Sequence, residues 1–161
     1  MQKSRMAVKA LGSTLKQNLM MAMKEGGPLN AIKFCNANAM PITEKIQKET
    51  GVKVSRTSLK YRNADNMPDP WESKVLAEFA KRGASGEAYK TMDFSEVVEA
   101  DGKRTFRYMK ALPAAEPCVI CHGDNIAPDL QAKIDELYPE DKATGFKIGD
   151  LRGAFSVKLD L

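Results

Sequence analysis

Apolar residues near the start of the chain recur at steps of three and four, the spacing that places them on one face of a helix. The pattern predicts one helix over 6–25 and a second over 29–49. A Gly-Gly-Pro run at 26–28 separates them, because glycine ends helices and proline fits a first helical turn. Pro41 interrupts the second pattern, and its missing backbone donor predicts a kink or a break just before it.

The rest of the chain contains both strand and helix patterns. Val52 and Val54 alternate with polar neighbours, which is typical of a strand with one buried face. Asp101-Gly102 lies between two longer strand patterns and predicts a tight hairpin. The predicted elements after the second helix are strands at 52–59, 88–100, 103–112 and 154–159, and helices at 71–83 and 128–137.

This order of elements predicts an α+β fold, in which the helices pack on one side of an antiparallel sheet. The 161 residues suit a single domain. Within that domain we expect a long N-terminal helix at 1–27 and a core at 28–161.

Composition and charge narrow the functional classes. Hydrophobic residues make up 43% and charged residues 29% of the chain, which is ordinary for a globular domain. The net charge of +4 is scattered and includes no basic block, so a nucleic-acid partner is not expected. No apolar stretch has the length of a membrane span, and no signal-peptide core is visible.

The strongest chemical signal is the C-x-x-C-H motif formed by Cys118, Cys121 and His122. This motif attaches a c-type haem: the two thiols form thioethers to the porphyrin, and the histidine becomes an axial ligand of the iron. We therefore expect one covalently attached haem c. Because such haem is attached outside the cytoplasm, we also expect a periplasmic or otherwise extracytoplasmic protein whose export signal or membrane anchor has been removed.

Three other interpretations of the motif are weaker. A thioredoxin-like C-x-x-C opens a helix in a βαβ unit, whereas Pro117 before the motif and Gly123-Asp124-Asn125 after it indicate a loop. A zinc site with three cysteines and one histidine would have to use adjacent ligands and lacks a second paired motif. A Cys118–Cys121 disulfide would leave Cys35 unpaired and His122 without a role.

The second axial position of the iron is an open question, because His122 is the only histidine of the chain. Cys35 lies on the apolar stripe of the second helix, so we expect it to point inward. An inward cysteine is often only a small buried hydrophobe. Methionine is the common ligand in electron-carrier cytochromes, and Met67 and Met109 are candidates. The Met20-Met21-Met23 cluster, a lysine, a tyrosine, water or no ligand also remain open.

Four segments of the chain resemble a bacterial family of small c-type haem domains of unknown function, often found in sensor proteins. C-x-x-C-H alone is generic, but the runs beginning at Arg56 and at Asn66 make the resemblance specific. The resemblance extends over about residues 10–160. The matching segments are 31–36, 56–63, 66–72 and 117–123.

The resemblance implies a PAS-like fold with one haem c and with His122 and Cys35 as the axial pair. This implication agrees with the expected inward position of Cys35 and with the absence of a second histidine. The chain has Arg62-Asn63-Ala64 where the family commonly has Arg-Asn-Pro. That difference concerns the stiffness of a loop and leaves the ligand assignment unchanged.

Arg56 and Arg62 lie in or just after the first predicted strand, with Lys60 between them. The propionates of a haem need cationic partners, and the arginine fork suits carboxylates. We expect Arg56 and Arg62 to be cofactor-binding residues, although each also fits a solvated strand face.

These observations favour a monohaem cytochrome that senses redox state or a small ligand through a labile Cys35. In that hypothesis reduction weakens the iron–thiolate bond, and the vacant ferrous position takes up a diatomic gas. The expected partner is an unidentified redox or signalling protein. A homodimer is also compatible with this sensing role. The alternative is a periplasmic electron carrier that docks on an acidic partner. An enzyme is not expected, because no distal histidine is available as a general base.

Overall fold

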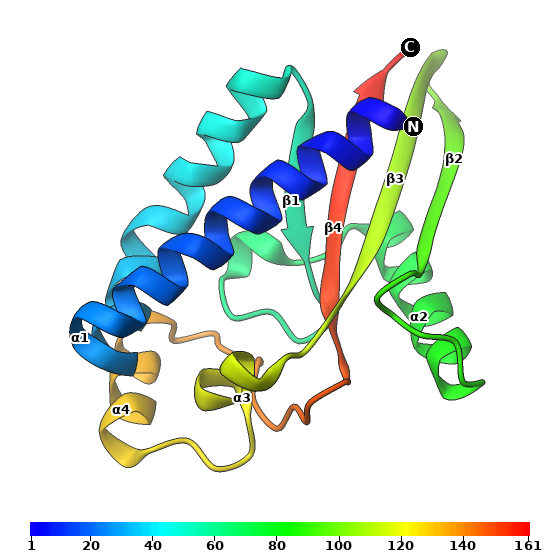
Figure 1. Cartoon of the computed structure of the whole chain (residues 1–161). Helices are drawn as coiled ribbons and strands as arrows, with labels where there is room; N and C mark the ends of the chain where they lie inside the picture. The colour runs from blue at the N-terminus through cyan, green and yellow to red at the C-terminus, as the bar shows by residue number, and fades with distance from the viewer.

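The computed structural model describes all residues, 1–161, and contains a four-stranded sheet with helices around it (Figure 1). The predicted α+β class is confirmed. None of the helices combines the length and the apolar run that a bilayer crossing needs. In chain order the elements are α1 (Gln2–Thr50), β1 (Lys53–Thr57), η1 (Ala64–Asn66), α2 (Pro70–Ala84), β2 (Asp93–Ala100), β3 (Lys103–Pro113), α3 (Glu116–His122), α4 (Pro128–Leu137) and β4 (Leu151–Asp160).

The helix α1 consists of two arms that form a V (Figure 1). The arms meet at Gly26 and Gly27, whose backbone dihedrals are not helical, so the predicted separation is confirmed. Gly27 has φ 68°, a left-handed conformation that glycine adopts without a Cβ clash. Of the kink or break predicted just before Pro41, the break is wrong, because the backbone stays helical there. Pro41 and Ala37, whose carbonyl loses its helical donor, are both exposed, so water can hydrate that carbonyl.

The sheet is antiparallel throughout and has the order β1-β4-β3-β2. The predicted hairpin between β2 and β3 is confirmed. Its two turn residues, Asp101 and Gly102, have φ values of 52° and 70°, the positive pair that a tight hairpin needs to match strand twist. The strand predicted at 88–100 begins later, at Asp93, because residues 89–91 form turns.

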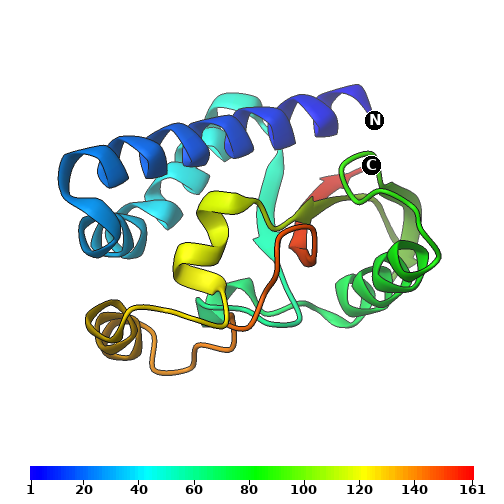
Figure 2. The ribbon, with the colours of Figure 1, turned by 60° about the horizontal axis from the view of Figure 1, so that its bottom comes forward.

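Helices cover both faces of the sheet, so the expectation that they pack on one side is wrong (Figure 2). Alternate residues of a strand point to opposite faces, and β3 and β4 are apolar at consecutive positions, which requires cover on both sides. Tyr108 and Phe155 pack against α1, while Met109 and Ala154 pack against α2. The sequence alone did not separate these two apolar sets.

A third apolar cluster joins the middle of α1 to α4 at one end of the sheet. Ile32 of α1 packs there with Leu130 and Ile134 of α4, and Cys121 of α3 packs against them. The Pro128–Leu137 helix predicted from the sequence has these bounds in the structure. The cluster holds α4 below the bend of α1, with α3 beside it (Figure 1).

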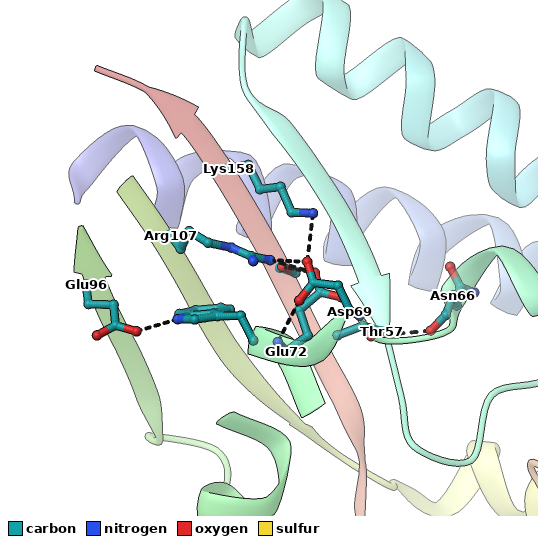
Figure 3. Close-up of polar contacts among 9 residues, drawn as sticks. Thr57, Asn66, Asp69, Glu72, Glu96, Arg107 and Lys158 are labelled. Carbon is teal, nitrogen blue, oxygen red and sulfur yellow. Dashed lines mark hydrogen bonds and ion pairs between the residues drawn. The ribbon is translucent and has the colours of Figure 1, made fainter. Parts of the chain in front are cut away.

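A buried polar network fixes the start of α2 to the other face of the sheet (Figure 3). Asp69 and Glu72 form a capping box, in which each side chain accepts the backbone N–H of the other residue. Arg107 donates to Asp69 at 2.8 Å and to Glu72 at 3.2 Å, and its guanidinium lies 4.2 Å from the centre of the Trp71 ring. Ser156 donates to Glu72 at 2.6 Å.

The same network sets the protonation of Asp69. Burial alone would raise the pKa of Asp69, but hydrogen bonds from Arg107, the Glu72 backbone and Lys158 lower that pKa to about 2. The segment 66–72, which carries part of the family resemblance, therefore begins a helix and anchors it to the sheet. It lies on the α2 face, whereas Cys35 lies on α1.

Glu72→Leu is expected to lower the free energy of unfolding by about 3 kcal/mol, because it leaves Arg107 and Ser156 buried without one acceptor. Urea denaturation measures this change. Lys158→Met removes a contact to the same Asp69 from a side chain that is 43% exposed, and should cost less than about 1 kcal/mol. Equal losses in the two variants would contradict the buried role of Glu72.

Candidate functional site

The C-x-x-C-H motif lies on a short helix, α3, and not in a loop as predicted. Pro117 stands in the first helical turn, where its missing N–H costs nothing, so the proline begins the helix and does not exclude one. Gly123 follows the helix and donates its N–H to the Val119 carbonyl at 2.9 Å. The strands on either side of the motif, β3 and β4, are antiparallel, so the βαβ unit of a thioredoxin-like site is not present.

The loop that connects α4 to β4 wraps around the end of α3 and holds His122. The Nδ1 atom of His122 lies 2.8 Å from the Ala143 carbonyl oxygen. The His122 carbonyl accepts the N–H of Phe146 at 2.9 Å, and the rings of these two residues meet edge to face at 6.3 Å. Gly145 donates to Gly123 at 2.8 Å. Backbone groups of one loop therefore fix both the ring and the main chain of His122.

His122 is neutral with a defined tautomer. Burial lowers its pKa to about 2, with the positive charges of Arg152, Arg62 and Arg56 acting in the same direction. A carbonyl oxygen can only accept a hydrogen bond, so Nδ1 carries the proton. The Nε2 atom therefore keeps its lone pair, which is the arrangement found in metal-binding histidines.

The two motif cysteines lie three residues apart on α3 and contact different apolar clusters. Cys118 packs against Ala114, Ala143 and Phe146. Cys121 packs against the apolar cluster of α1 and α4. Both thiols are free and half-buried, and burial raises the pKa of Cys121 despite the opposing charge of Arg62.

Cys35 lies on the second arm of α1, half-buried, as the apolar stripe predicted. Burial raises the pKa of its thiol, and the charges of Arg56 and Arg62 oppose this shift. The same two arginines act on His122, and Cys35 is close enough to Cys121 to affect its pKa. The structure thus brings Cys35 to the region of the motif from a distant part of the sequence.

The methionines considered as ligands differ in burial. Met109 is fully buried in the cluster beneath α2, on the face of the sheet opposite α1. Met67 is 62% exposed after η1. Met20 and Met21 are exposed on the first arm of α1.

No set of three or more histidine, cysteine, aspartate and glutamate side chains is placed to hold a metal ion. The zinc interpretation required Cys35, Cys118, Cys121 and His122 to converge on one small ion. These residues share a region but do not form such a cluster.

Arg62 is buried and held by an acid. Its Nε and Nη2 atoms donate to the two carboxylate oxygens of Asp141 at 3.1 and 3.2 Å, and both side chains are 7% exposed. Nη2 also donates to the Ala143 carbonyl at 3.1 Å, while the buried Nη1 atom has no partner. The Ala143 carbonyl therefore accepts hydrogen bonds from both His122 and Arg62, so Arg62 helps to hold it in place.

Arg56 and Arg152 complete a cationic region around the motif. The side chain of Arg56 is half-buried beside Cys35 and makes no hydrogen bond or ion pair. Arg152 was missed in the sequence, because it lies at the start of the last strand far from the other arginines. Its Nη1 atom donates to Ser58 and to the Lys60 carbonyl, both at 3.2 Å. Burial and then the charges of Arg62 and Arg56 lower the pKa of Arg152 to about 10.

The fold and the site together define a small α+β domain with a PAS-like sheet, in which a C-x-x-C-H helix lies beside a cysteine of the long N-terminal helix. The chain belongs to the Tll0287-like family, whose model matches residues 1–159. Its structure is similar to the crystal structure of the cyanobacterial haem protein Tll0287, with a TM-score of 0.68 and 25% sequence identity over 95% of this chain and 92% of that chain. No curated protein sequence matches the chain. The predicted family resemblance and PAS-like fold are confirmed.

Asp141→Asn is expected to lower the free energy of unfolding by about 3 kcal/mol, because it leaves Arg62 buried without a counter-charge. Chemical denaturation measures the loss, and hydrogen exchange should show faster exchange at the Phe146 amide as the loop loosens. Asp150→Asn changes an exposed acid of the same loop and serves as the control. A stability change no larger than that of the control would contradict the role assigned to the Arg62–Asp141 pair.

Proposed function

We propose that this chain is a monohaem c-type cytochrome that acts as a redox or small-ligand sensor through Cys35. The observation that carries the proposal is His122: its Nδ1 is held by Ala143 and its Nε2 is free, on a helix with two free thiols. Membership of the Tll0287-like family supports it, because Tll0287 is itself a haem protein.

The residues present fit a covalently attached haem. Cys118 and Cys121 are free and accessible for thioether bonds, and His122 offers a neutral ring nitrogen as axial ligand. The buried, partnerless Nη1 atom of Arg62 and the unpaired Arg56 leave positive charge that the propionates of a haem neutralise. A haem c held by Cys118, Cys121 and His122 would supply a one-electron redox centre.

Cys35 is the residue that we propose as the second protein ligand that would hold a bound haem. It is the free thiol outside the motif, it comes from a different helix, and it shares Arg56 and Arg62 with His122. A thiolate is held more weakly by ferrous than by ferric iron, because the reduced ion carries one positive charge less. With a haem bound, Cys35 would be a thiolate beside the ferric form, and it would take up a proton once an electron from a redox partner reduced the haem; the haem would supply the binding of a diatomic gas.

The position of Cys35 on α1 links this ligand exchange to the rest of the fold. The second arm of α1 carries Cys35, and the first arm packs on the sheet beyond the Gly26-Gly27 bend (Figure 1). Movement of Cys35 would therefore shift the second arm of α1, and such a movable arm is the two-state element that signalling requires. An unidentified redox or signalling protein outside the cytoplasm reads that change. This role is not enzymatic.

One observation favours the alternative function of an electron carrier. Ile120 of α3 is 40% exposed, so a haem attached to this helix would lie near the surface, as electron transfer requires. The excess of positive charge suits an acidic redox partner. The two functions differ in whether Cys35 binds and leaves the iron.

Cys35→Ala is expected to keep the covalent haem, to remove a thiolate-type charge-transfer band from the ferric spectrum and to raise the reduction potential, because a negative ligand is lost. Visible spectra of the ferric and reduced forms and a redox titration measure these changes. Met67→Ala is the control for methionine ligation and should leave the spectra unchanged. If Cys35→Ala has the wild-type ferric spectrum, Cys35 is not the ligand, and the electron-carrier function becomes the better explanation.

Cys118→Ala and Cys121→Ala are each expected to weaken haem attachment, because each removes one of two thioether bonds. The pyridine haemochrome spectrum distinguishes none, one and two thioether linkages, and denaturing electrophoresis with haem staining measures the covalent fraction. Cys35→Ala should retain full attachment in the same assay. Complete attachment through two linkages in either motif variant would contradict the assignment.

A further inference from the structure

The region around the motif holds more positive than negative charge. Arg56, Arg62 and Arg152 are all close enough to lower the pKa of His122. The one carboxylate that pairs with any of them is Asp141, which binds Arg62. Like charges gathered in a partly buried region repel one another more strongly than they do in bulk water. The cluster is therefore unfavourable in the protein alone, which indicates that an anion completes it.

Arg62 is not free to serve this anion as a full partner. Two of its nitrogens are engaged by Asp141 at 3.1 and 3.2 Å, so its charge is largely neutralised. Its Nη1 atom remains buried without an acceptor, and this orphaned donor is independent evidence that an acceptor is missing from the site. The role of Arg62 is to position the loop and to add one donor.

Arg152 has donors left for a ligand. Its Nη1 atom is tied to Ser58 and Lys60, but Nε and Nη2 donate to no protein atom. Neither of these two atoms is fully buried, so both face an accessible space. Its guanidinium lies 5.1 Å from the centre of the Phe146 ring, whose edge-to-face partner is His122.

Arg56 provides a second free guanidinium from the neighbouring strand. It has no partner in the protein, and it extends from the face of β1 that α1 covers, beside Cys35. Arg56 and Arg152 each lack a carboxylate, and each is close enough to affect the other. Two separate guanidinium groups suit a ligand with two carboxylates.

We propose that Arg56 and Arg152 form a binding site for a pair of carboxylates, with Nη1 of Arg62 as an additional donor. The identity of the ligand rests on the proposed function, because the two carboxylates would be the two propionates of a haem. The proposal assigns Arg152, which the sequence did not single out, and it makes Arg62 mainly a positioning residue that keeps one donor for the ligand. The same chemistry would also recognise a free dicarboxylate, and the test separates these two sources.

The proposal implies opposite effects of Arg152 in the loaded and unloaded proteins. When the carboxylates are bound, Arg152→Gln removes an ion pair and destabilises the fold. When they are absent, the same change removes repulsion and stabilises it. A purely structural role, through Ser58 and Lys60, would destabilise both forms.

The experiment compares thermal unfolding of Arg152→Gln in the holoprotein and in the full chain carrying Cys118→Ala and Cys121→Ala, purified without haem. We expect Arg152→Gln to lower the Tm of the holoprotein by about 2–4 °C and to raise that of the haem-free chain. Arg104→Gln, an exposed arginine on β3, is the matched control and should change neither Tm. A decrease in both forms, or no change in either, overturns the proposal.

A second measurement does not depend on the folding of the haem-free chain. In the holoprotein, Arg152→Gln should lower the reduction potential, because it removes a positive charge that favours the reduced state, and Arg152→Lys should restore most of it. An unchanged potential in Arg152→Gln counts against the proposal.

Titration of the haem-free chain with succinate separates the ligand sources. Under the proposal, succinate raises its Tm, and Arg152→Gln abolishes this effect. If no haem attaches to the wild-type chain, the proposed function fails while this succinate effect still supports a dicarboxylate site. If haem attaches but Arg152→Gln behaves as Arg104→Gln in every assay, the carboxylate site fails and the proposed function remains.

Discussion

The buried ion pair of Arg62 and Asp141 is the interaction on which the arrangement of the site depends. Both side chains are 7% exposed, so the pair is held in a region where charges interact strongly. Arg62 also binds the Ala143 carbonyl, the same carbonyl that accepts Nδ1 of His122. One ion pair thus fixes a loop, the loop fixes a tautomer, and the tautomer decides which nitrogen of the histidine is available.

The two faces of the sheet have separate tasks. On the α2 face, Asp69, Glu72 and Arg107 tie a helix to the strands through a buried polar network (Figure 3). On the other face, α1 bends back on itself (Figure 2), and its second arm carries Cys35 close to Arg56 and Arg62. Two segments that both resemble the family therefore have different roles: segment 66–72 stabilises the α2 face, and segment 56–63 contributes to the site on the other face.

Much of the fold could be predicted from local patterns. Helical periodicity identified both arms of α1, and the Asp101-Gly102 pair identified the β2–β3 hairpin, because each signal depends on neighbours in sequence. The errors at Pro41 and at the motif helix have a common cause. Proline was taken as a helix breaker, whereas Pro41 is exposed and Pro117 lies in a first turn, where the missing donor is tolerated.

The sequence by itself determined the chemistry that is available: one C-x-x-C-H motif, a single histidine and one further cysteine on an apolar helical stripe. The tertiary structure alone decided that helices cover both faces of the sheet, that Asp141 neutralises Arg62, and that Arg152 joins Arg56 beside the motif. Periodicity and motifs report contacts between residues near each other in the chain. Burial and charge pairing depend on residues brought together from distant segments, as Arg62 and Asp141 are, and no local pattern encodes that pairing.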